Sequence, residues 1–237
     1  MMKQKEREFV CFAHRGASGH EPENTLLAIE KALSLGAAWI EIDVFCVEGE
    51  LVVIHDERLE YTTNGRGYVT EKTLAHLRTL DAGKGQSIPL LREVFDLVQR
   101  RAGINVELKG AGTAAPAVQL VRDYIVNRGW HYDQVILSSF DHRELSVVKP
   151  LDPEIRTGAL ILGVPRHYAR FAEELKAFSV HAGLAFANRA FVEDAHQRGL
   201  KFYVYTVNFP DDLDRVRAMG ADGVFTNFPE LVIPQKN

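Results

Sequence analysis

Short apolar runs alternate with longer mixed stretches along most of this chain, and several runs end close to charged residues. Residues 9–13 and 39–45 are rich in Val, Ile and aromatic side chains, which is typical of buried strands. Residues 25–35 between them are predicted to form a helix, with Asn24 as its N-cap and Gly36 as its stop. The chain therefore begins in the order strand, helix, strand.

The same order of strand and helix returns through the second half of the sequence. Further strands are predicted at residues 104–108, 134–138, 157–162, 178–184, 201–207 and 223–226. Helices are predicted at residues 90–101, 114–128, 142–148, 168–175, 188–197 and 210–219. The total of eight parallel strands favours a single TIM (β/α)8 barrel domain over residues 1–237. The alternative is a doubly wound open sheet, but no G-x-G-x-x-G motif follows the first strand.

One stretch after the second strand does not fit this alternation. Residues 51–55 are predicted to return antiparallel to that strand through a tight turn at residues 48–50. Residues 56–89 then hold several turn-forming glycines and a short helical piece near residues 71–78. Because long loops in compact domains are usually functional, we expect residues 56–89 to form a small insertion over the barrel mouth.

Composition narrows the class of protein. A net charge of −4 and an isoelectric point near 6.1 do not suggest a nucleic-acid binder. Cys11 and Cys46 lie in predicted strands and form no CxxC pair, so we expect them to behave as small buried hydrophobes. Residues 1–8 lack the apolar core of a signal peptide, and no apolar run is long enough to span a membrane. We expect a cytoplasmic protein without a transmembrane segment.

Carboxylates and cations lie at the ends of the first three barrel strands. Glu41 and Asp43 are two positions apart, and so are Glu107 and Lys109, so each pair points to one face of its strand. In a barrel these strand ends meet at one mouth, where Arg15 also lies. Carboxylate oxygens suit Mg²⁺ or Ca²⁺, so we expect one divalent cation there. The alternative is an ion-pair layer without a metal.

His14 and His55 lie close to the same acids and are candidates for a general acid–base pair, since imidazole titrates near neutrality. The alternative is that either histidine only makes structural hydrogen bonds. The remaining histidines are expected on the surface or in local structural roles, although one of them lies on a strand; they are His20, His76, His131, His142, His167, His181 and His196.

Two cations and one aromatic residue are candidates for substrate binding. Arg15 and Lys109 are suited to bind phosphate oxygens, with simple pairing to carboxylates as the alternative. Tyr205 lies at a strand end and is expected to line the substrate pocket. Tyr203 and Phe225 are expected in the core.

Taken in chain order, these residues and their neighbours resemble the glycerophosphodiester phosphodiesterase family over nearly the whole chain. The resemblance rests on a series of short motifs that are weak singly and specific together. They are His14-Arg15-Gly16-Ala17, Pro22-Glu23-Asn24-Thr25, Glu41-Ile42-Asp43-Val44, Val53-Ile54-His55-Asp56, Thr62-Thr63-Asn64-Gly65-Arg66-Gly67, Ile88-Pro89-Leu90, Asn105-Val106-Glu107-Leu108-Lys109, Ser138-Ser139-Phe140, Tyr205-Thr206-Val207-Asn208 and Asp222-Gly223-Val224-Phe225-Thr226-Asn227-Phe228-Pro229.

The resemblance implies metal-dependent hydrolysis of small glycerophosphodiesters to sn-glycerol 3-phosphate and an alcohol. It also implies roles for single residues: Glu41, Asp43 and Glu107 as metal ligands, His14 and His55 in catalysis, and Arg15 and Lys109 in phosphate binding. One alternative is a lysophospholipase D-type phosphodiesterase of the same superfamily, and another is a non-catalytic protein that binds phosphodiesters. Neither the oligomeric state nor the preferred alcohol follows from the sequence.

Two positions depart from the commonest pattern of that family. Tyr205 stands where Trp is usual, and Asn227 stands where Asp is usual. Neither position is expected to bind the metal or transfer a proton. We therefore expect both to alter the shape of the substrate pocket and to leave the reaction class unchanged.

Overall fold

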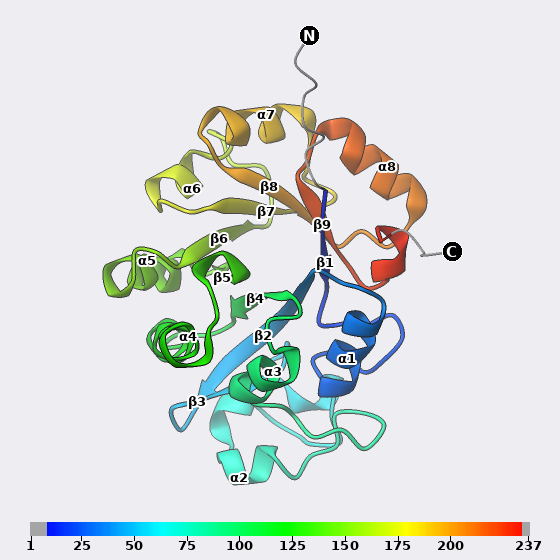
Figure 1. The fold of residues 1–237 in the computed structure, drawn as a ribbon, viewed down its shortest axis with the longest axis vertical. Coiled ribbons are helices and arrows are strands. Elements are labelled where there is room, and N and C mark those ends of the chain that lie inside the picture. Colours follow the sequence, from blue (N-terminus) through cyan, green and yellow to red (C-terminus); the bar gives the residue numbers. More distant parts are fainter. Residues whose placement is uncertain (1–8, 234–237) are drawn as a thin grey trace.

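The computed structural model describes residues 9–233. One sheet of nine strands runs in the order β1-β9-β8-β7-β6-β5-β4-β2-β3 and closes through a further β1–β2 pairing. Only β3 (Glu50–Val53) is antiparallel to its neighbour, which leaves eight parallel strands in a closed barrel (Figure 1). These are β1 (Val10–Ala13), β2 (Trp39–Val47), β4 (Gly103–Leu108), β5 (Val135–Ser139), β6 (Arg156–Ile161), β7 (Ser179–Gly183), β8 (Lys201–Tyr205) and β9 (Gly223–Thr226). The predicted TIM barrel is confirmed.

Helices follow the strands and form the outer ring of the barrel (Figure 1). They are α1 (Leu26–Ser34), α3 (Leu91–Val98), α4 (Ala114–Arg128), α5 (His142–Leu151), α6 (Arg170–Glu174), α7 (Arg189–Gln197) and α8 (Pro210–Met219). Every helix predicted outside the insertion is present. The largest differences are that α3 ends three residues before the predicted 101, that α5 continues three residues past 148 and that α6 is shorter than the predicted 168–175.

The predicted cap of the first helix is wrong by one residue. The Thr25 hydroxyl, not the Asn24 side chain, accepts the hydrogen bond from the backbone N–H of Ala28. Asn24 takes a left-handed conformation with φ 57°, which Asn tolerates better than most residues. Its amide donates to the Asp43 carboxylate at 2.9 Å, so Asn24 joins the loop after β1 to β2.

An aromatic cluster fills the inside of the barrel below its mouth. Phe12 stacks on Phe225 with ring centroids 4.5 Å apart and meets Tyr203 edge-on at 4.9 Å. All three side chains are buried, as expected for Tyr203 and Phe225. Any cavity inside the barrel must therefore lie above these rings, toward the carboxyl ends of the strands.

The barrel closes through a short seam between β1 and β2. These two strands align at only two pairs of residues, whereas β2 and β4 align at six. Just beyond the seam, the backbone N–H of Arg15 donates to the Glu41 carboxylate at 2.8 Å. The Glu41 side chain thus adds one hydrogen bond to the backbone pairing that joins β1 and β2.

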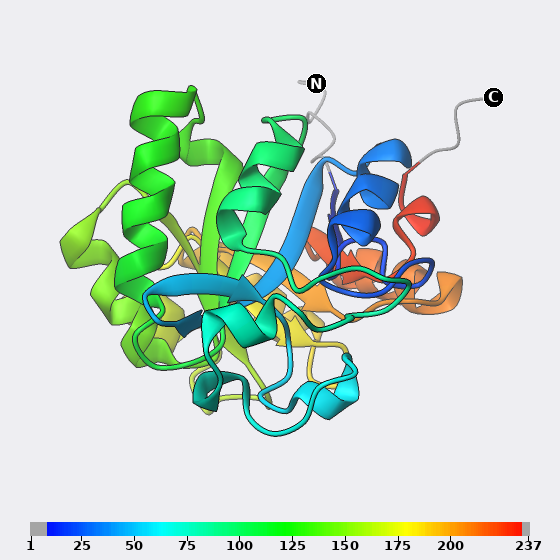
Figure 2. The ribbon, with the colours of Figure 1, turned by 90° about the horizontal axis from the view of Figure 1, so that it is seen from below.

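The insertion is built on the β2–β3 hairpin, as predicted. It contains two 3-10 turns, η1 (Leu59–Tyr61) and η2 (Val69–Glu71), and the short helix α2 (Leu74–Leu77). Its apolar side chains pack with those of the hairpin into a separate small core. Arg78 binds the Glu93 carboxylate through both terminal nitrogens and so ties the insertion to α3. In Figure 2 the insertion, coloured cyan to teal, lies at one end of the barrel beside β3.

Within residues 9–233, no helix combines the length and the apolar character that a membrane span requires. The longest helix, α4, has 15 residues, whereas a span needs about 20. The N-terminal stretch that lacks a signal-peptide core, residues 1–8, lies outside the described part of the chain.

Candidate functional site

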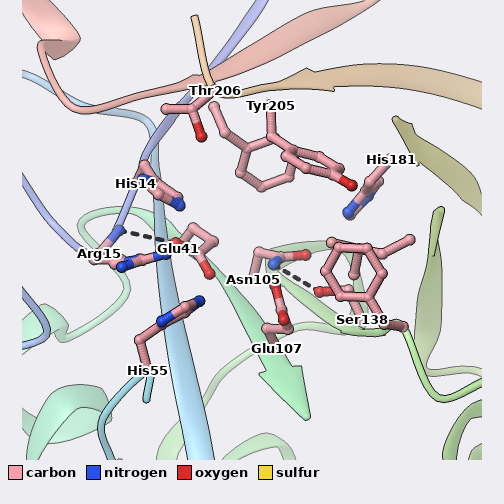
Figure 3. A pocket seen from close by; sticks show the side chains of 13 residues that line it. His14, Arg15, Glu41, His55, Asn105, Glu107, Ser138, His181, Tyr205 and Thr206 are labelled. Carbon is pink, nitrogen blue, oxygen red and sulfur yellow. Dashed lines mark hydrogen bonds between the residues drawn. The ribbon is translucent and has the colours of Figure 1, made fainter. Parts of the chain in front are cut away.

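A cavity of about 290 Å³ lies at the carboxyl ends of the barrel strands (Figure 3). Most of the residues singled out in the sequence line it: His14, Arg15, Glu41, His55, Glu107 and Tyr205. Asp43 and Lys109 are in contact with these residues through ion pairs. The structure therefore brings all eight candidate residues together, from β2, β4 and β8 and from the segments directly after β1, β3 and β4.

Three buried carboxylates form the centre of the site. Oxygen atoms of Glu41, Asp43 and Glu107 lie within 4.8 Å of one another. The alternation of β2 puts Glu41 and Asp43 on one face, and the parallel register pairs Asp43 with Glu107 on β4. Burial and then the Asp43 charge raise the pKa of Glu107 to about 7, and burial raises the pKa of Glu41 well above its ordinary value. This all-oxygen set fits a hard divalent cation, which would stabilise the crowded negative charge.

Two cations flank the carboxylates. Arg15 donates to Glu23 at 2.9 Å and lies 3.5 Å from Asp43. The Lys109 ammonium lies 2.9 Å from Glu107 and 3.8 Å from Asp43. The ion pairs considered as an alternative are thus present. When all three buried carboxylates are ionised, these two cations leave one negative charge over, which a bound cation would balance.

His14 is held by a residue from the opposite end of the chain. Its Nδ1 lies 2.7 Å from Oδ1 of Asn227, which accepts the Nδ1 proton and leaves Nε2 with its lone pair. Burial and then the Arg15 charge lower the pKa of His14 to about 4, so the ring is neutral at pH 7. The sequence led us to expect that Asn227 alters only the shape of the substrate pocket. The structure shows that it also contacts a candidate catalytic residue.

His55 is held by a carboxylate of its own loop. Its Nδ1 lies 3.0 Å from Oδ1 of Asp56, and Figure 3 shows Arg15 and Glu41 between the two histidines. Atoms of Glu23, His55 and Asp56 also lie within 4.8 Å of one another. These three residues are only half-buried, and each carboxylate already has a partner, so this group orients His55 and Arg15.

Some residues of the cavity received no functional role from the sequence. Asn105 lies on the Glu107 face of β4, and its amide donates to the Ser138 hydroxyl at 2.9 Å. The two-residue spacing from Glu107 was the one available signal for Asn105. His181 is fully buried and lines the same cavity, although it was grouped with the structural histidines. Its place on a strand does not reveal which face it occupies.

Tyr205 lines the cavity as expected, whereas two of the other histidines lie outside its lining. The Tyr205 hydroxyl donates to the backbone oxygen of Ile161 at 2.9 Å, and its ring meets that of Phe140 edge-on with centroids 5.8 Å apart. His142 and His196 make local contacts outside the cavity lining, to the backbone oxygen of Leu160 and to Asp222 respectively.

The chain is similar over almost its whole length to a protein family, to related sequences and to a solved structure. Residues 14–231 match the model of the Glycerophosphoryl diester phosphodiesterase family. A glycerophosphodiester phosphodiesterase of Caldanaerobacter subterraneus subsp. tengcongensis is 36% identical over 236 residues, covering 94% of this chain and 96% of the relative. One from Bacillus subtilis is 35% identical and covers 94% and 84%. An Oleispira antarctica phosphodiesterase, solved in complex with the product sn-glycerol-3-phosphate, has a TM-score of 0.86 at 31% identity, with 94% of each chain covered.

Proposed function

Because this chain belongs to the glycerophosphoryl diester phosphodiesterase family, we propose that it hydrolyses glycerophosphodiesters to sn-glycerol 3-phosphate and an alcohol, with the help of a divalent cation. The observation that carries the proposal is the meeting of two histidines, two cations and three carboxylates in one cavity. A similar structure was solved with sn-glycerol-3-phosphate, which supports this choice of product.

Glu41, Asp43 and Glu107 would hold the cation, Mg²⁺ or Ca²⁺. Two contacts prepare the ligands: the Asn24 amide donates to Asp43, and the Arg15 backbone N–H donates to Glu41. Such outer contacts fix the orientation of ligand oxygens. When bound, the cation supplies Lewis acidity, which polarises phosphoryl oxygens and lowers the pKa of a coordinated hydroxyl.

Arg15 and Lys109 would bind the phosphate oxygens of the substrate. Both side chains are mostly buried beside the carboxylates, so their charges act in a site of low dielectric constant. The planar guanidinium of Arg15 suits two phosphate oxygens at once, and the Lys109 ammonium acts as a point charge. Both would stabilise the charge that grows on the phosphoryl oxygens in the transition state.

His14 would act as the general base and His55 as the general acid. His14 is neutral at pH 7 with a free Nε2, so it can take the proton of the attacking hydroxyl, either water or the 2-hydroxyl of the substrate's glycerol. The Asp56 carboxylate accepts from Nδ1 of His55, which leaves Nε2 to deliver a proton to the departing alcohol. The insertion, residues 56–89, would border this side of the pocket directly after His55.

The test is release of glycerol 3-phosphate from glycerophosphocholine by protein that has been stripped with a chelator and then supplied with Mg²⁺ or Ca²⁺. Turnover that depends on the added cation supports the proposal. Choline release from lysophosphatidylcholine, without turnover of glycerophosphocholine, would favour the lysophospholipase D-type alternative. Binding of glycerophosphocholine without turnover under any cation would favour a non-catalytic binding protein.

A further inference from the structure

The cavity continues past the candidate catalytic residues into the barrel. At this inner end it is lined by the polar residues Asn105, Ser138 and His181 and by the apolar residues Leu160 and Phe225. Figure 3 shows His181 and Ser138 on one side of the pocket and Arg15 and His55 on the other. Asn105 precedes Glu107 by two residues on β4, so it lies about 7 Å deeper at the usual strand rise. None of these residues has a role in the chemistry proposed above.

Two polar atoms at the inner end have no partner among residues 9–233. They are Oδ1 of Asn105 and Nδ1 of His181. Both side chains are at most 1% exposed. Buried polar atoms almost always have a hydrogen-bond partner, so a pair of them facing one cavity indicates a missing polar ligand.

The two side chains are held in place by their surroundings. Gly158 on β6 makes room for the imidazole, because a Cβ at this position would lie 2.4 Å from Cε1 of His181. The ring nitrogen Nε2 lies 2.8 Å from the Ser179 hydroxyl. The Asn105 amide nitrogen is bound to Ser138 at 2.9 Å, which orients Oδ1. The inner end is therefore a preformed polar site with a fixed geometry.

The chemistry of this site favours an uncharged hydroxyl group. Burial lowers the pKa of His181 to about 3, so the imidazole carries no charge at neutral pH. A hydroxyl can donate to the Asn105 oxygen and accept from Nδ1–H of His181, which satisfies both atoms. A quaternary ammonium has no proton to donate and would find no negative charge here. Leu160 and Phe225 offer apolar contacts for the carbon atoms that carry the hydroxyl.

We propose that Asn105 and His181 form an inner subsite for the terminal hydroxyl of the substrate's glycerol unit, the hydroxyl farthest from the phosphate. The alcohol leaving group then points toward the open mouth of the barrel. This assignment rests on the proposed phosphodiesterase function, and it makes the two residues determinants of specificity for glycerol.

The test compares glycerophosphocholine with an analogue that lacks only the terminal hydroxyl. A site that hydrogen-bonds a hydroxyl rejects the analogue strongly, so we expect the natural protein to prefer glycerophosphocholine by at least about 100-fold in kcat/KM. His181→Phe and Asn105→Leu should reduce this preference to about tenfold or less, by slowing the intact substrate and not the analogue. The exposed His131 provides a matched control, since His131→Phe should keep the full preference.

An unchanged preference in folded His181→Phe and Asn105→Leu would overturn the subsite, as would an ordered water that remains there with substrate bound. Failure of the natural protein to cleave either substrate would instead overturn the proposed function. If the variants do not fold, imidazole ¹⁵N resonances of the natural protein provide a second measurement. Glycerol 3-phosphate should shift the His181 signals more than the product lacking the terminal hydroxyl does, and equal shifts would contradict the subsite.

Discussion

His14 and Asn227 are 213 positions apart in the sequence and are joined by a hydrogen bond of 2.7 Å from Nδ1 to Oδ1. Asn227 is itself fixed, because its backbone N–H donates to Asn208 at 2.9 Å and its backbone oxygen accepts from Gly19 at 2.9 Å. A neutral amide thus determines which nitrogen of the proposed base carries the proton. A carboxylate at position 227 would fix the same tautomer of His14, and its negative charge would in addition stabilise the protonated imidazolium.

Exchanging this amide for a carboxylate tests the link between Asn227 and the base. In Asn227→Asp the hydrogen bond is kept, but the added charge raises the pKa of His14, which burial and Arg15 lower to about 4. The ring is then protonated at a higher pH, so the acid limb of kcat/KM should move upward. Measured pH profiles check this at saturating cation. Superimposable profiles of the two proteins would show that Asn227 does not act on His14.

Removing either histidine tests the proposed acid–base pair. His14→Ala and His55→Ala should each lower kcat by about 10²–10⁴ and change KM less, since proton transfer is lost while phosphate binding remains. Steady-state kinetics with glycerophosphocholine measure the effect. His131→Ala, an exposed change outside the cavity, is the control and should retain the full rate. A rate near that of the natural protein in either cavity variant would remove that histidine from the mechanism.

The carboxylate cluster should oppose folding when no cation is bound. The pKa of Glu41 is higher in the folded state than in the unfolded state. Folding therefore becomes less favourable as the pH rises above the unfolded-state pKa, and the protein is less stable at neutral pH for this reason. Glu41→Gln should therefore melt at the same or a higher temperature than the natural protein in a chelator, yet bind Mg²⁺ or Ca²⁺ more weakly. Thermal melts with and without cation measure both effects. A lower melting temperature of the variant in chelator would contradict this account.

Asp222 provides a prediction about stability that is independent of the active site. Its buried carboxylate accepts from Lys201 at 2.8 Å, His196 at 2.7 Å and the Phe202 backbone at 2.9 Å. Burial alone would raise its pKa, but these bonds outweigh burial and lower it. Asp222→Ala should cost about 2 kcal/mol at pH 7, because buried donors lose their acceptor.

The sign of this effect sets its pH dependence. A lowered folded pKa stabilises the protein above the unfolded value of 3.8, and that contribution is lost as the pH falls through the folded pKa. Urea unfolding at pH 7 and at pH 3 measures the free energy of unfolding of the natural protein and of Asp222→Ala. The difference between the two proteins should be smaller at pH 3. A difference that is equal at both pH values would contradict the pKa shift.

The alternation of β2 and β4 made much of the site predictable. Two-residue spacing determines that Glu41 and Asp43 share a face, and parallel strands bring Glu107 beside them. The cap of α1 was not predictable, because Asn24 and Thr25 are both good caps. The Asn24–Asp43 contact, made across 19 positions, decides between them. The face occupied by His181 depends on the stagger of the closed barrel, which local sequence does not determine.

Glu41 has two tasks, since one carboxylate oxygen extends the β1–β2 seam and the group also belongs to the proposed cation site. Barrel closure and cation occupancy are therefore linked through one side chain. A cation that immobilises Glu41 would also hold the acceptor of the Arg15 backbone N–H in place, and its removal would loosen one of the two shortest strand pairings in the barrel. Hydrogen–deuterium exchange at the Arg15 amide should accordingly quicken as the cation is withdrawn, which would turn a single backbone proton into a reporter of the state of the active centre.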